Sequence, residues 1–216
     1  MKFINAYKGI SKIFLAEILS LFAMLCLSVI YIFRAAFLEN IDDVNSFTSD
    51  ITAVILLVIL AAAGVLSIIS LVLKIVGVVQ AAKDEGSFQL IIYVILFDIA
   101  VSLVASIFSA SRMVNSLSNV VSDVAELLVT LLIILGVCNL ALQLKNRQVL
   151  EKGHTLIKLI FIIQLISIVA SISLLFLWTI IGRAFLISLA SLAAVLSFTK
   201  YVLYLMFLRE AKEMLK

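Results

Sequence analysis

Proline is absent from all 216 residues, and charge is scarce, since 13% of residues are charged and 65% are hydrophobic. Without proline, helices that are broken around a binding site, as in many transporters, are not expected. With so little charge, a soluble domain is excluded, because it would lack the polar surface needed to cover its core. The composition therefore indicates a membrane-embedded chain, in agreement with a mean hydropathy of +1.30.

Histidine and cysteine are also rare. His154 is the single histidine and is expected in a loop, while Cys26 and Cys138 fall inside apolar stretches and are interpreted as small packing residues. These residues cannot form a metal cluster. The chain has no G-x-S-x-G motif, no glycine-rich phosphate loop and no H-E-x-x-H motif. We therefore expect no cofactor and no enzymatic activity.

What the sequence has in abundance is apolar runs of about 20 residues or more. The backbone of such a run must form its hydrogen bonds internally in lipid, so each run predicts a transmembrane helix. Six runs are present, at residues 13–33, 51–79, 88–110, 124–144, 156–179 and 184–208. The prediction is an all-α integral membrane protein whose six transmembrane helices form a single membrane domain, residues 1–216.

The segments between these runs differ in charge. Eleven basic residues fall on the side that carries both termini, whereas three fall on the other side, Arg34, Arg112 and Arg183. The acids of that other side are Glu39, Asp42, Asp43, Asp50, Asp123 and Glu126. By the positive-inside rule, we expect both termini to be cytoplasmic and the chain to lie in the plasma (inner) membrane. The net charge of +3 then indicates contact with anionic lipid at the cytoplasmic face rather than with nucleic acid.

A short phrase recurs along the chain. Residues 17–23, EILSLFA, return as residues 164–170, QLISIVA, and residues 102–105, SLVA, repeat its second half. The copies lie on alternate runs, which predicts three repeats of one helical hairpin each, at about residues 1–83, 84–150 and 151–216. Because every hairpin starts and ends on the same side, the three hairpins are expected to be parallel and to form a bundle with approximate three-fold pseudo-symmetry.

Polar residues inside the runs are the candidates for a functional site near mid-membrane. They are Glu17, Lys74, Asp98, Ser102, Gln164 and Lys200. Asp98 lies on the order of 15 Å from the cytoplasmic start of its run. A charged aspartate at that depth costs about 2.5–3.5 kcal/mol. We therefore expect Asp98 to be neutral, hydrated or paired with Lys74 or Lys200.

The other charged candidates have simpler interpretations. Glu17 is close enough to the start of its run to reach the headgroup level and pair with Lys8 or Lys12. The long stems of Lys74 and Lys200 allow their ammonium groups to extend toward the interface.

Two classes of function stay open. If the polar residues line a water-filled or solute-filled cavity, the chain is a transporter or channel for a small solute or ion. If they are packing seams, it is a non-catalytic membrane partner, such as a subunit, chaperone or immunity-type protein that acts by helix–helix binding to another membrane protein. The buried ionisable residues favour transport, while the lack of kinks and of soluble domains favours a partner.

Overall fold

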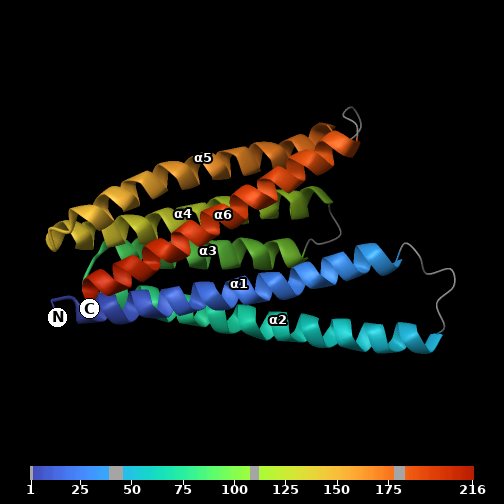
Figure 1. Ribbon diagram of the computed structural model, residues 1–216, viewed down its shortest axis with the longest axis horizontal. Helices are drawn as coiled ribbons and strands as arrows, with labels where there is room; N and C mark the ends of the chain where they lie inside the picture. Colours follow the sequence, from blue (N-terminus) through green and yellow to red (C-terminus); the bar gives the residue numbers. More distant parts are fainter. Residues whose placement is uncertain (1, 39–45, 108–111, 178–182) are drawn as a thin grey trace. The chain divides into compact units, whose positions relative to one another are not determined.

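The computed structural model describes residues 2–38, 46–107, 112–177 and 183–216 (Figure 1). These residues form six helices: α1 (Ile4–Leu38), α2 (Ser46–Ala81), α3 (Ser87–Ile107), α4 (Arg112–Gln143), α5 (Arg147–Leu177) and α6 (Arg183–Leu215). No strand occurs in these ranges, so the all-α prediction is confirmed for them.

Four helices are long and apolar enough to cross a membrane within the described residues. The windows are Ile4–Ile30 in α1, Val54–Ala81 in α2, Ser87–Ile107 in α3 and Val120–Gln143 in α4. They indicate a membrane protein with several spans, as their backbone and side chains both suit lipid. Membrane crossing by α5 and α6, which are joined through residues outside the described ranges, stays a prediction.

Two local predictions are corrected. α4 begins at Arg112 and not near residue 124, so Asp123 and Glu126 lie on a helix and within the candidate span Val120–Gln143. His154 lies on α5 and not in a loop, because the helix already begins at Arg147. Several residues behind the predicted charge asymmetry lie outside the described residues: Glu39, Asp42 and Asp43, and the side chains of Arg34, Asp50, Arg112 and Arg183.

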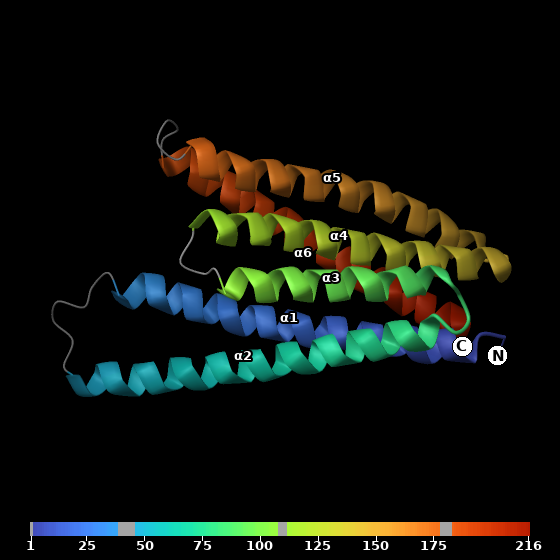
Figure 2. The ribbon, with the colours of Figure 1, turned by 180° about the vertical axis from the view of Figure 1, so that it is seen from behind.

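The helices are grouped into two compact units. Unit 1 contains residues 1–10 and 78–216, and unit 2 contains residues 11–77. In unit 1, α3 packs on α4, α4 on α5 and α5 on α6, in chain order, and α4 also contacts α6 (Figures 1 and 2). α4 is therefore the central helix of unit 1, and half of its spanning window is buried, compared with 17% for α3. Unit 2 is the hairpin formed by the remainder of α1 and α2.

The α4–α5 connection is short because both helix ends are capped. The N–H of Asn146 donates to the carbonyl of Ala141 at 2.9 Å, and that of Lys145 donates to Leu142 at 3.1 Å, which closes the end of α4. Lys145 takes up the left-handed conformation that this motif requires, with φ of 56°. The Asn146 side chain then accepts the N–H of Val149 at 3.2 Å and so caps α5.

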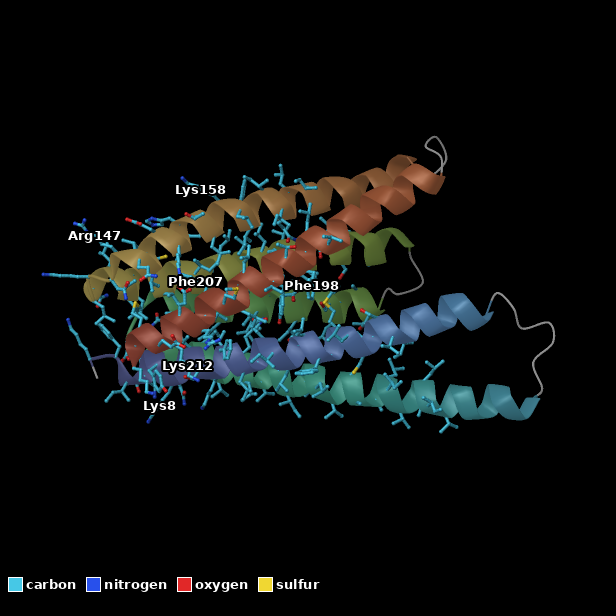
Figure 3. The ribbon with its side chains drawn as sticks, in the orientation of Figure 1. Lys8, Arg147, Lys158, Phe198, Phe207 and Lys212 are labelled. Atoms are coloured by element: carbon cyan, nitrogen blue, oxygen red, sulfur yellow. The ribbon has the colours of Figure 1, made fainter. Side chains whose placement is uncertain are left out.

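Two glycines allow close packing in unit 1. A Cβ atom on Gly136 of α4 would lie 2.6 Å from the ring of Phe88, which is fully buried on α3. On α5, a Cβ atom on Gly153 would meet the sulfur of Cys138 and the ring of Phe207, which is labelled on α6 in Figure 3. Small residues are needed at both positions because a neighbouring side chain occupies the space in front of them, the Phe88 ring at Gly136 and mainly the Cys138 sulfur at Gly153.

We expect Gly136→Ala to lower the free energy of unfolding by about 1–3 kcal/mol, because the buried Phe88 ring has no free space to move into. The matched control is Gly64→Ala on α2, where an added Cβ atom meets nothing within 4 Å. That change should leave stability equal or raise it by up to about 1 kcal/mol through helix propensity. Unfolding in mixed micelles measures both, and equal effects of the two variants would contradict the packing argument.

Candidate functional site

A buried ion pair joins the two helices of unit 2. The Nζ of Lys74 on α2 lies 2.6 Å from Oε1 of Glu17 on α1, and the two side chains are 20% and 5% exposed. The structure thus pairs Glu17 with Lys74 instead of the predicted Lys8 or Lys12. A carboxylate buried between helices requires such a direct counter-charge.

Serines extend this seam by one turn. The hydroxyl of Ser70 donates to the carbonyl of Ala16 at 2.8 Å, and the Ser20 and Ser70 oxygens are 2.7 Å apart. Ser70 is nearly fully buried, so the two hydrogen bonds satisfy a polar group that lipid could not solvate. Glu17, Ser20, Ser70 and Lys74 therefore form one polar seam between the two helices of unit 2.

A second group of polar side chains gathers around α4 in unit 1, and we call it the α4 polar cluster. Its members are Asp98 of α3, Ser122, Asp123 and Glu126 of α4, Gln164 of α5 and Lys200 of α6. The hydroxyl of Ser122 donates to Oδ1 of Asp98 at 2.7 Å. Ser122 and Glu126 are four residues apart, so they share one face of α4 about 6 Å apart along the axis.

Lys200 reaches the same face of α4 from the other side of the unit. Its Nζ donates to Oε1 of Gln164 at 2.8 Å and lies 3.9 Å from Oε1 of Glu126. The Lys200 side chain is 13% exposed and that of Glu126 is 61% exposed, so the direct partner is the neutral amide and the ion pair with Glu126 is loose. Asp123 interacts electrostatically with both Lys200 and Glu126.

The charges of the α4 polar cluster do not cancel. Among the side chains that the structure describes, the cluster has three carboxylates, those of Asp98, Asp123 and Glu126, and one ammonium group, that of Lys200. The direct partners of Asp98 and Lys200 are both neutral, a hydroxyl and an amide. In lipid such charges are costly, and ionisable groups kept in a span without full neutralisation are characteristic of solute or ion pathways.

The predicted site residues are thus distributed over two places. Asp98, Gln164 and Lys200 belong to the α4 polar cluster, and Glu17 and Lys74 form the ion pair of unit 2. Ser102 is exposed on α3. The hydroxyl that donates to Asp98 is that of Ser122 and not that of Ser102. Pairing of Asp98 with Lys200, one of the alternatives for Asp98, is not among the contacts of these two described side chains.

Three members of the α4 polar cluster were not predicted as site residues: Ser122, Asp123 and Glu126. Ser122 resembles the many other serines of the chain, and only its partner on the neighbouring helix distinguishes it. Asp123 and Glu126 were assigned to the outer side because they lie at the start of the fourth apolar run. The four-residue spacing of Ser122 and Glu126 was the available signal, since it places both on one helix face.

Comparison of the chain with family models, with curated proteins and with solved structures finds no match.

Proposed function

We propose that this chain is a non-catalytic plasma-membrane protein that moves a small solute or ion, and that the α4 polar cluster is its site. The observation that carries the proposal is the convergence of Asp98 and Lys200, two opposite charges with neutral direct partners, on one face of α4. A solute with a charged group can supply the counter-charge that the protein itself does not place in direct contact.

The ion pair of unit 2 is the internal reference for this argument. Glu17 and Lys74 neutralise each other at 2.6 Å, as is expected of a structural link between two helices. Lys200 instead has glutamine as its direct partner, which leaves its positive charge less compensated. Within one chain, one lysine is therefore paired directly with a carboxylate, whereas the other has a neutral amide as its nearest partner.

The charge of the α4 polar cluster favours a particular kind of solute. Three carboxylates against one ammonium group attract a positive group, and Lys200 offers one contact for a negative group. A cationic or zwitterionic solute matches this set better than an anion. The site requires no cofactor for such a role.

The full architecture that we propose has six spans, as three parallel hairpins, with both termini in the cytoplasm. Figure 3 supports the orientation, because Lys8, Arg147, Lys158 and Lys212 all lie toward the end of unit 1 that carries the termini. Their positive charge also suits the anionic lipid of the cytoplasmic leaflet.

A common spacing of contacts supports a relation between the first and third hairpins. In both, a polar contact near the terminus-bearing end is followed by a second contact, twelve residues later on the first helix and ten residues earlier on the return. These contacts are Asn5–Asp84 and Glu17–Lys74, then Lys152–Glu210 and Gln164–Lys200, and Asp84 lies just past the end of α2. The second hairpin has Ser87–Asn139 at the first position and apolar residues, Ile99 and Val129, at the second.

A three-probe uptake experiment tests the function. Purified protein is reconstituted into liposomes, and the uptake of radiolabelled choline, glycine and acetate is compared with uptake by protein-free liposomes. We expect choline or glycine to enter several-fold faster than acetate, because the surplus of carboxylates repels the anion. Uptake of none of the three above the protein-free rate, together with no thermal stabilisation by any of them, would remove the transport proposal.

The alternative function is that of a membrane partner, and one surface favours it. A groove of about 330 Å³ between α3 and α4 is lined almost wholly by apolar side chains, among them Phe97, Val101, Val104 and Leu117. Such a groove suits the side chains of an apolar helix from another membrane protein. Stable co-purification of a second membrane protein in mild detergent, without any uptake, would support this function in place of transport.

A further inference from the structure

A groove at the start of α3 has the chemistry of a lipid site. It has a volume of about 530 Å³ and is lined by Val79, Ala82, Lys83, Gln89, Ile92 and Tyr93. These residues belong to the end of α2, the connecting turn and the first two turns of α3. Since both helices are candidate spans that end here, the groove lies at the level where a lipid headgroup meets its acyl chains.

The acids next to the groove are engaged elsewhere. Asp84 accepts hydrogen bonds from the backbone N–H of Ala6 at 2.7 Å and from the Asn5 amide at 2.9 Å. Glu85 accepts hydrogen bonds from the Ser87 hydroxyl and from the amide groups of Asn139 and Gln143, at 2.9–3.2 Å. Neither carboxylate lines the groove, so its polar side carries the positive charge of Lys83 alone.

Lys83 differs in this respect from the lysine at a comparable groove between α5 and α6. There Lys152 lies at the mouth and is bound by both oxygens of Glu210, at 2.7 and 2.9 Å. Lys83 is exposed, and the described residues offer its side chain no ion pair or hydrogen bond. It is thus a cation at a groove mouth that has no counter-charge within the described part of the chain.

We propose that this groove binds one anionic phospholipid. Lys83 contacts the phosphate, Gln89 and the Tyr93 hydroxyl hydrogen-bond the polar headgroup, and an acyl chain lies along Val79 and Ile92. A zwitterionic lipid fits less well, because no carboxylate of the groove receives its ammonium group. The proposal concerns unit 1 alone and is independent of whether the chain transports a solute.

The test compares two lysine-to-glutamine variants of the full chain. Delipidated protein in detergent is titrated with phosphatidylglycerol or phosphatidylcholine, and bound lipid is counted by native mass spectrometry. We expect wild type to prefer phosphatidylglycerol and Lys83→Gln to weaken its binding about five-fold, the effect of one basic residue at an anionic lipid surface. Lys152→Gln, which removes the same charge from a lysine already paired with Glu210, should leave the affinity within two-fold.

A third variant tests the apolar part of the groove. Ala82→Phe places a ring in the groove and keeps every charge, so it should also weaken phosphatidylglycerol binding. Equal losses for Lys83→Gln and Lys152→Gln would show a diffuse response to net charge and overturn the proposal. Equal binding of the two lipids by wild type, or unchanged binding by Ala82→Phe, would overturn it as well.

Discussion

Glu17→Met should lower the free energy of unfolding by about 3–5 kcal/mol, because it leaves the ammonium of Lys74 inside the hairpin without its carboxylate. The pair is direct, at 2.6 Å, and the side chains of Glu17 and Lys74 are 5% and 20% exposed. Neither water nor a headgroup therefore replaces the lost partner easily. Unfolding of the purified protein in mixed micelles measures the change.

The double variant Glu17→Met, Lys74→Met separates a lost charge pair from lost packing. With both charges removed, two apolar side chains of similar volume remain in the seam, and stability should return to within about 1 kcal/mol of wild type or exceed it. An exposed pair provides the control, since Lys152→Gln at the Lys152–Glu210 pair should change stability by no more than about 1 kcal/mol. If Glu17→Met were no more harmful than Lys152→Gln, the ion pair of unit 2 would have no structural role.

The ion pair of unit 2 also illustrates what hydropathy and spacing predict. The depth of Glu17 and Lys74 in their runs follows from the sequence, and so does the expectation that neither charge is left alone. Their pairing does not follow, because it depends on how α1 and α2 are rotated about their axes. Near neighbours along the chain, Lys8 and Lys12, were preferred as partners of Glu17, whereas the actual partner lies on the returning helix.

The helices themselves were predictable because lipid imposes one backbone solution on a long apolar run. The ends of the helices were less predictable, because hydropathy detects the apolar segment of a helix and not the polar turns that continue it. α4 begins at Arg112 and includes Asp123 and Glu126 because no proline or glycine interrupts it there, and these two acids thereby become part of the α4 polar cluster. The start of α5 was missed for another reason, which is capping. The Asn146 side chain caps α5 directly after the end of α4, so His154 lies on a helix and not in a loop.

Our transport proposal for the α4 polar cluster depends most on Asp98. We expect Asp98→Asn to reduce uptake of the best-transported probe about ten- to hundred-fold, which corresponds to the loss of a charged hydrogen bond worth about 1.5–3 kcal/mol. Folding should be preserved, because the asparagine oxygen can still accept the hydrogen bond that Ser122 donates at 2.7 Å. Removal of a charge from the membrane should even favour the folded state slightly.

Two serine variants show whether the contacts around Asp98 determine its effect. Ser122→Ala removes the hydroxyl that orients the carboxylate, so it should reduce uptake by a smaller factor, about five-fold for a bond worth about 1 kcal/mol. Ser102→Ala, one turn along α3 from Asp98 but exposed, should leave uptake unchanged. If Asp98→Asn lowered stability and uptake together, Asp98 would be a packing residue, and undiminished uptake in a stable Asp98→Asn protein would exclude it from the solute pathway.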